Sequence, residues 1–189
     1  MKPLLPLLVT CALISMLLGC GQKRPPTPQA KPNSAVQKLA ETKTPKKRFY
    51  ALREAAKQSF KDGNVENARK YADELLATAA KFPSDWNYGN AIHDGNLVLG
   101  RIALREGHTS EAKQFLLKAG ASPGSPQLGS FGPNMSLANN LLEKGERDTV
   151  LQYFELCRKF WKMGQQKLDT WSQEVKDGKV PDFGANLLY

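Results

Sequence analysis

Side chains that could carry acid–base, nucleophilic or metal chemistry are few in this chain, and their spacing does not suit catalysis. The two histidines, His93 and His108, have no cysteine or acidic partner at metal-ligand spacing, so we expect no metal site. Residues 120–124 match G-x-S-x-G around Ser122, but that motif needs a strand before the serine, and here a helix precedes it. No P-loop and no dinucleotide fingerprint occurs. We therefore expect a protein that is not an enzyme and uses no cofactor.

The three cysteines offer two further kinds of chemistry. Cys157 is the only one beyond the N-terminal region, so no internal disulfide framework is possible there. Its neighbours include Phe154, Phe160 and Trp161, which predicts a buried and inert thiol rather than a nucleophile. The other two cysteines belong to the N-terminal region: Cys11 lies within an apolar run, and Cys20 lies at its end.

The N-terminal region resembles the signal peptide of bacterial lipoproteins. A largely apolar run over residues 4–18 is too short to span a bilayer and suits an export signal. It ends in LLGC at residues 17–20, which is similar to a lipobox. The resemblance implies that the signal (1–19) is removed, that the Cys20 thiol receives a diacylglycerol, and that membrane lipid is therefore a partner. The alternatives are an ordinary cleaved signal with a chance cysteine and an uncleaved anchor.

The next segment, residues 20–48, is rich in proline and lysine and is predicted to be a disordered tether. It holds eight basic residues and one acid, so most of the formal net charge of +9 lies there. This charge would hold the tether near anionic lipid, or would only keep it soluble. In Gram-negative lipoproteins, an Asp directly after the lipidated cysteine resembles a signal for retention at the inner membrane. Here that position is Gly21. The absence of Asp favours the periplasmic face of the outer membrane. Residues 49–189 are almost neutral, which argues against a nucleic-acid partner.

A helical pattern with glycine turns recurs along residues 49–160. Residues 99–119 are predicted to form two short antiparallel helices that turn at Gly107, and Gly63 and Gly145 mark equivalent turns. Small or apolar residues recur seven positions before these glycines and five and nine positions after them: Ala56, Gly100 and Ala138, then Ala68, Ala112 and Val150, then Ala72, Leu116 and Phe154. The pattern resembles the tetratricopeptide repeat, although the glycines are 44 and 38 residues apart rather than about 34. The resemblance implies an all-α solenoid of about three helical hairpins.

Caps and helix breakers predict the elements of a helical domain over residues 49–189. The expected helix pairs are 45–61 with 64–81, 85–106 with 109–119, and 133–144 with 146–164, followed by a capping helix over 165–177. Residues 120–133 are expected to form a long loop, and residues 181–189 an apolar tail. The apolar side chains Phe131, Phe183, Leu187 and Leu188 either fill gaps in the end of the solenoid, which we favour, or present an interface.

In tetratricopeptide proteins, defined positions of each first helix face a concave surface that binds peptides. The resemblance carries this role to the following candidate peptide-binding residues: Tyr50, Arg53, Lys57, Lys61, Leu97, Arg101 and Arg105. Five cations with interleaved apolar residues would suit an acidic or C-terminal peptide. The carboxylate clamp of some family members is not reproduced, because its asparagine is replaced by Lys57 and Arg101 in the first two units. The alternative is that these cations are ordinary solvated side chains.

The sequence thus predicts a membrane-anchored envelope lipoprotein that acts as a non-catalytic protein-binding or scaffold module, with an envelope protein or peptide as partner. One alternative is an enzyme or accessory factor that acts on cell-wall material through the 120–135 loop. Another is a self-associating structural protein.

Overall fold

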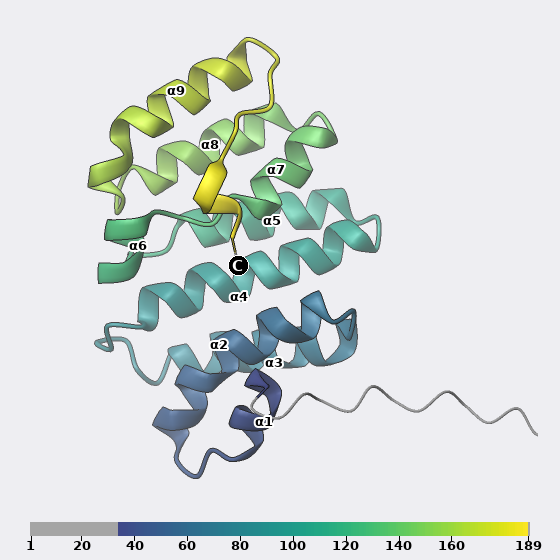
Figure 1. The fold of residues 1–189 in the computed structure, drawn as a ribbon, viewed down its shortest axis with the longest axis vertical. Coiled ribbons are helices and arrows are strands. Elements are labelled where there is room, and N and C mark those ends of the chain that lie inside the picture. The colour runs from purple at the N-terminus through teal and green to yellow at the C-terminus, as the bar shows by residue number, and fades with distance from the viewer. Residues whose placement is uncertain (1–33, 189) are drawn as a thin grey trace, which may run out of the picture.

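The computed structural model describes residues 34–188, which form helices without any strand (Figure 1). The elements are α1 (Ala35–Ala40), α2 (Pro45–Lys61), α3 (Val65–Ala79), α4 (Tyr88–Arg105), α5 (Thr109–Gly120), α6 (Pro126–Phe131), α7 (Ser136–Glu143), α8 (Arg147–Cys157), η1 (Lys162–Gly164), α9 (Gln165–Lys176) and η2 (Gly184–Leu187). The all-α prediction is confirmed for this part of the chain. Among these helices none has the length and apolar character needed to cross a membrane. The predicted signal 1–19, Cys20 and the tether up to residue 33 lie outside the described residues.

The helices follow one another in space in the order of the sequence and build a stack (Figure 1). Helices α2 and α3, α4 and α5, and α7 and α8 form the three pairs that the sequence predicts. Helix α3 also packs on α4, α5 packs on α8, and α9 covers α8. The pairs therefore share their apolar faces with their neighbours along the stack.

The turns within the pairs confirm the local sequence signals. Gly63, Gly107 and Gly145 have φ values of 79°, 85° and 82°, which is backbone that L-residues rarely adopt. A Cβ at any of the three would meet nothing within 4 Å, so glycine is needed there for its conformation and not for space. Thr44 accepts a hydrogen bond from the Lys47 amide at 3.3 Å, so it caps α2 as expected.

The second half of the predicted tether is folded, which corrects the expected domain boundary. Ser34 caps α1 by accepting a hydrogen bond from the Gln37 amide at 3.1 Å. Leu39 is buried in a core cluster with Phe49 and Leu52 of α2. A serine cap followed by apolar residues at helical spacing outweighs the proline- and lysine-rich composition of this stretch. The helical domain therefore includes residues 34–48.

The predicted loop 120–133 contains a helix, which is a second correction. Ser125 accepts a hydrogen bond from the Leu128 amide at 3.0 Å, and Pro126 occupies the first turn of α6. Leu128 is buried against the rest of the fold. The helix ends at Gly132, whose φ is 87°. Proline is common in loops and also at the first turn of a helix. In a segment rich in Gly, Pro and Ser, the composition predicts a loop although Ser125 and Pro126 begin a helix.

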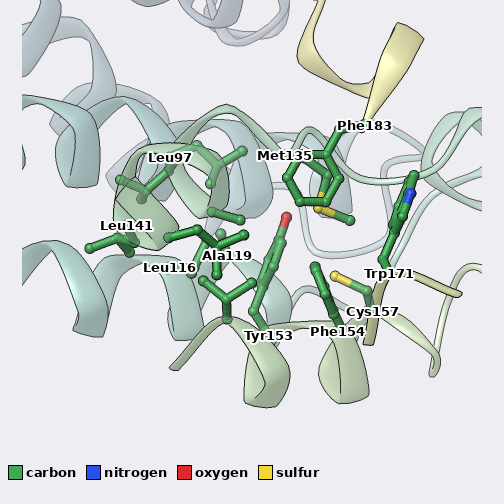
Figure 2. Close-up of a cluster of buried hydrophobic side chains, with 14 of the residues drawn as sticks. Leu97, Leu116, Ala119, Met135, Leu141, Tyr153, Phe154, Cys157, Trp171 and Phe183 are labelled. Carbon is green, nitrogen blue, oxygen red and sulfur yellow. The ribbon is translucent and has the colours of Figure 1, made fainter. Parts of the chain in front are cut away.

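The largest core cluster joins the second half of the stack to the segment that follows α9 (Figure 2). Phe183 is 1% exposed, and its ring centroid lies 5.0 Å from that of Trp171 and 6.1 Å from that of Phe154. The prediction that tail side chains fill gaps is therefore confirmed for Phe183. It is wrong for Phe131 and Leu188, which are 77% and 78% exposed. Three buried apolar clusters hold the described residues together.

Cys157 lies in the same cluster and is buried, as the sequence predicts. Burial raises the pKa of its thiol well above the ordinary value, because a thiolate would be poorly solvated there. Nucleophilic chemistry at Cys157 would therefore require the fold to open.

Candidate binding cleft

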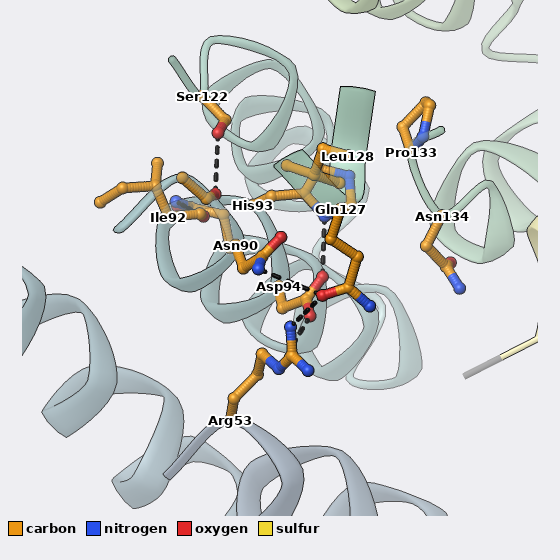
Figure 3. A network of polar contacts seen from close by, with 12 residues as sticks. Arg53, Asn90, Ile92, His93, Asp94, Ser122, Gln127, Leu128, Pro133 and Asn134 are labelled. Carbon is orange, nitrogen blue, oxygen red and sulfur yellow. Dashed lines mark hydrogen bonds and ion pairs between the residues drawn. The ribbon is translucent and has the colours of Figure 1, made fainter. Parts of the chain in front are cut away.

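A cleft of about 150 Å³ lies where α2 and α4 meet the α6–α7 segment and the residues after α9. Its lining comprises Arg53, Lys57, Asn90, His93, Asp94, Gln127, Leu128, Phe131, Gly132, Pro133, Asn134, Ala185, Asn186 and Leu188. Figure 3 shows the polar side chains of α2, α4 and α6 that converge beneath it. Segments more than a hundred residues apart in the sequence thus contribute to one surface.

Asp94 is the charge at the floor of the cleft. Its carboxylate lies 2.8 Å from Lys57 Nζ and 3.8 Å from Arg53 Nε, on the side that faces α2. Burial by itself raises the pKa of this carboxyl, but the charge of Lys57, the hydrogen bond from His93 and the charge of Arg53 outweigh burial and hold the pKa well below its usual range. Asp94 is therefore an ion at any physiological pH, and it fixes two cations at the cleft wall.

His93 connects this floor to the opposite half of the stack. The side chain is fully buried, and its two ring nitrogens lie 2.8 Å from Asp94 Oδ1 and 3.1 Å from the Tyr153 hydroxyl. The Tyr153 hydroxyl donates to the Asn134 carbonyl at 2.9 Å. This relay of polar contacts runs from α4 through α8 to the residues before α7. These contacts connect Asp94 at the floor of the cleft to Asn134 in its lining.

Helix α6 is joined to the floor through amide side chains. Gln127 Oε1 accepts hydrogen bonds from Arg53 Nη1 at 2.9 Å and from Asn90 Nδ2 at 3.1 Å. Asn90 Oδ1 accepts a third bond, from the Ser125 hydroxyl at 2.7 Å. These contacts tie α2, α4 and α6 together and leave the cleft lined by side chains that are already oriented.

Ser122 serves the backbone of this region. Its hydroxyl donates to the Gly89 carbonyl at 2.8 Å and accepts from the Gly124 amide at 3.1 Å. The serine is 5% exposed and lies in the connection between α5 and α6, away from any strand. Ser122 in the G-x-S-x-G match therefore has a structural role: its hydrogen bonds connect the start of α4 to the loop after α5.

The residues after α9 form the third wall. Asn186 donates through its amide to the carbonyls of Phe131 and Pro133, at 3.1 Å and 2.9 Å. Its own carbonyl accepts from the Met135 amide at 2.7 Å. Asn134 Nδ2 donates to the Leu188 carbonyl at 3.0 Å. Asn186 therefore fixes both the tail and the segment that connects α6 to α7.

The structure gathers only part of the predicted peptide-binding set. Arg53 and Lys57 line the cleft. Leu97 is fully buried in the largest core cluster, so its predicted role in binding is wrong. The reason is that α4 is packed on several sides, by α2, α3 and α5 and, at Leu97, by the cluster that contains Met135 and Leu137, so that every residue from 93 to 100 is buried.

The remaining candidates lie outside the cleft lining. Tyr50 donates its hydroxyl to the Asp85 carboxylate at 2.8 Å. The Arg101 guanidinium lies 4.5 Å from the centroid of the Phe60 ring. Lys61 and Arg105 are exposed, each at the C-terminal end of its helix. The candidate cations thus do not form one continuous groove.

Several residues of the cleft escaped the sequence analysis, among them Asn90, Gln127, Asn134 and Asn186. Polar residues inside the apolar face of α4 were the available signal for Asn90, because a buried amide requires partners. Among residues 34–188 no group of His, Cys, Asp and Glu is placed to hold a metal ion. The chain was compared with protein-family models, curated proteins and solved structures, and none of them matches it.

Proposed function

We propose that this protein is a lipid-anchored envelope protein whose helical domain binds a partner protein without catalysis, through the cleft between α2, α4, α6 and the tail. The single observation that carries the binding proposal is the placement of Phe131 and Leu188. These side chains are 77% and 78% exposed, and both border the cleft that contains Arg53 and Lys57. Exposed apolar side chains around an oriented polar cleft are typical of a surface that a partner covers.

The partner segment that fits this surface is extended, with apolar side chains and a carboxylate. Among the Asp, Glu, Lys and Arg side chains of the lining, two are positive and one is negative. Asp94 offsets one of the two cations of the lining. Glu54, outside the lining and 53% exposed, lies 3.0 Å from Arg53 Nε and 3.7 Å from Lys57 Nζ, so an acidic group of the partner would compete with Glu54 for these cations. Phe131 and Leu188 would pack against apolar side chains on either side of that group.

The polar groups of the cleft support binding better than catalysis. A carboxylate whose pKa is held far below neutrality is a weak proton acceptor, and His93 is buried behind it. One observation favours the rival hypothesis, in which the 120–135 segment acts on cell-wall material: six residues of that segment line the cleft, namely Gln127, Leu128, Phe131, Gly132, Pro133 and Asn134. Turnover of cell-wall fragments by the purified protein would decide for the rival.

The fold part of the proposal is a tetratricopeptide-like solenoid. Two observations support this fold. Three consecutive helix pairs have a glycine with positive φ at the turn, and α9 packs on α8 at the end of the stack. Helices α1 and α6 are additions to that plan, and α7 is short at eight residues. The lipid anchor is supported by the LLGC sequence at residues 17–20.

Photo-crosslinking in cells tests the binding surface. A photo-reactive amino acid at position 131 should capture a discrete partner, and the same group at Val180, which is 50% exposed outside the cleft lining, should not. Capture should disappear when Arg53→Glu is added, because the reversed charge would repel an acidic segment. Equal capture from both positions, or capture that persists with Arg53→Glu, would contradict the proposed site.

The anchor is tested separately. Cys20→Ser should release the protein from the membrane fraction and remove the mass of the lipid. A variant that stays in the membrane pellet with unchanged mass would refute lipidation and would leave the cleft proposal untouched.

A further inference from the structure

A second surface lies at the end of the stack where α1, the start of α2 and the α3–α4 connection meet. We call it the basic end and define it by Lys43, Lys46, Lys47, Lys81 and Trp86, all of which are exposed. None of these residues lines the cleft. The basic end therefore needs an explanation of its own.

Trp86 is held in place although it is 57% exposed. Its ring is stacked on that of Tyr50, with centroids 5.8 Å apart. Lys46 Nζ lies 5.9 Å from the centroid of Tyr50 and 3.2 Å from the Asp85 carboxylate. Asp85 in turn accepts from the Tyr50 hydroxyl at 2.8 Å. These contacts place an indole ring and an ammonium group side by side at the surface, and the contacted residues orient both.

The charge of this end is strongly positive. Residues 38–48 and 81–86 contain six bases, Lys38, Lys43, Lys46, Lys47, Arg48 and Lys81, and two acids, Glu41 and Asp85. Glu74 of α3 pairs with Arg48, so the net charge of this end is +3. Folding of residues 34–48 is what creates this surface, because it places on a structured face five bases that composition alone assigns to a tether. A fixed cluster of lysines attracts a polyanionic surface more strongly than the same charges spread along an extended chain.

The length of chain before α1 limits how far this end can lie from the proposed anchor. Thirteen residues, and hence fourteen Cα–Cα steps, separate Cys20 from Ser34, which caps α1. Even a fully extended chain of that length spans at most about 50 Å. Helix α1 packs on α2, so the basic end and the point where the chain arrives belong to the same end of the stack (Figure 1).

We propose that the basic end binds the anionic phospholipid surface of the membrane, with Trp86 in the headgroup region and the surrounding lysines on the phosphates. The proximity argument rests on the proposed lipid anchor, whereas the affinity of the surface does not. Tryptophan favours the interface because its ring is apolar and its N–H is polar. Each lysine near an anionic surface adds about 1 kcal/mol, which is about fivefold in the binding constant.

Tryptophan fluorescence gives a direct readout of this contact. The chain has three tryptophans, and Trp161 and Trp171 are only 4% and 6% exposed. A blue shift on addition of vesicles therefore reports Trp86. The protein used is residues 21–189 without signal or lipid, so that the anchor does not contribute and the bases before α1 are the same in every variant that is compared. We expect a blue shift with vesicles of phosphatidylglycerol and phosphatidylcholine, none with phosphatidylcholine alone, and reversal at high salt.

Charge reversal with a matched control tests the location. Lys43→Glu with Lys47→Glu should weaken vesicle binding by at least about 25-fold at low salt, following the fivefold per lysine above. Lys144→Glu with Lys176→Glu makes the same change in net charge at exposed positions of the other half of the stack and should weaken binding by less than about threefold. Trp86→Ala should abolish the blue shift while vesicle sedimentation persists at reduced affinity. Circular dichroism confirms that each variant is folded.

Three results would overturn the proposal. The first is the absence of a blue shift with anionic vesicles. The second is an equal loss of binding in the two charge-reversal variants. The third is a dimer in light scattering that Trp86→Ala dissociates, which would assign this surface to a second copy of the chain. None of these results bears on whether Cys20 is acylated, because the protein used lacks that residue.

Discussion

Replacement of Asp94 by asparagine perturbs the polar network beneath the cleft at its centre. The change preserves shape and removes a buried negative charge that lies 2.8 Å from Lys57 Nζ and 3.8 Å from Arg53 Nε. The same carboxylate lies 2.8 Å from His93 Nδ1. Without it, the two cations keep only the half-exposed Glu54, 3.0 Å from Arg53 Nε and 3.7 Å from Lys57 Nζ, as a shared counter-charge. We therefore expect Asp94→Asn to destabilise the fold.

The size of the effect follows from burial. Removing one partner of a fully buried ion pair destabilises a protein by about 3–5 kcal/mol. The Lys57 and Arg53 side chains are each 17% exposed, so water screens part of the remaining repulsion. The asparagine oxygen also keeps one hydrogen bond. We expect the free energy of unfolding to fall by about 2–3 kcal/mol, which for a domain of this size lowers Tm by about 4–12 °C.

The pH dependence has a definite sign. A carboxyl whose folded-state pKa lies below its unfolded value stabilises the fold fully above the unfolded pKa, about 3.9 for aspartate. That stabilisation is lost as the pH falls through the folded-state pKa, which Lys57, His93 and Arg53 depress. The difference in stability between the wild type and Asp94→Asn should therefore be constant from about pH 5 to pH 8 and should shrink below about pH 4.

Urea unfolding followed by circular dichroism measures this difference. Asp73→Asn, at an exposed position of α3, is the matched control and should change stability by less than about 0.5 kcal/mol. An Asp94→Asn variant as stable as the wild type at pH 7 would refute the argument. So would a difference that grows as the pH falls, because it would mean that the wild-type group is stabilised in its protonated form.

Three further experiments probe the packing of the fold near the cleft and in the core beside it. Gly132→Ala should lower the free energy of unfolding by about 3 kcal/mol or more, since its φ is 87° and a Cβ would lie 2.5 Å from a ring carbon of Trp161. Gly63 has the same left-handed backbone but open space around it. Gly63→Ala should therefore lower the free energy of unfolding by only about 1–2 kcal/mol in the same melting experiment. Phe183→Ala should lose about 3–5 kcal/mol because the ring is buried, whereas Leu188→Ala should keep the wild-type Tm and weaken partner capture. Cys157 in a protein of residues 21–189 should react with a thiol reagent only at the rate at which the fold opens, since the thiol is buried and burial raises its pKa; rapid reaction without urea would contradict its burial.

The arrangement of the cleft explains why these effects are expected to couple. Asn186, from the tail, holds the carbonyls of Phe131 and Pro133, and Tyr153 holds that of Asn134. A change on one wall is therefore transmitted to the segment that presents the exposed Phe131 side chain. Double variants that combine a wall residue with a tail residue should deviate from additivity for this reason.

The local elements of this fold could be predicted from the sequence. Thr44 and Pro45 predict the start of α2, and Gly63, Gly107 and Gly145 predict the three turns, because caps and left-handed positions depend on a few neighbouring residues. Two helices, α1 and α6, were missed because the proline-rich composition of their segments was given more weight than their capping residues. Ser34 and Ser125 cap helices within segments rich in proline.

The cleft itself was decided by tertiary structure. Which face of α4 is open depends on contacts between residues far apart in the chain, such as His93 with Tyr153 and Asn186 with Phe131, at separations of 60 and 55 residues. Hydrophobic periodicity shows that a helix has a buried face, but it does not show which distant helices cover its other faces. That is why Leu97 is part of the core while Arg53 and Lys57 reach the cleft. Helix positions follow from short-range sterics and capping, whereas the binding surface follows from long-range packing that no local pattern encodes.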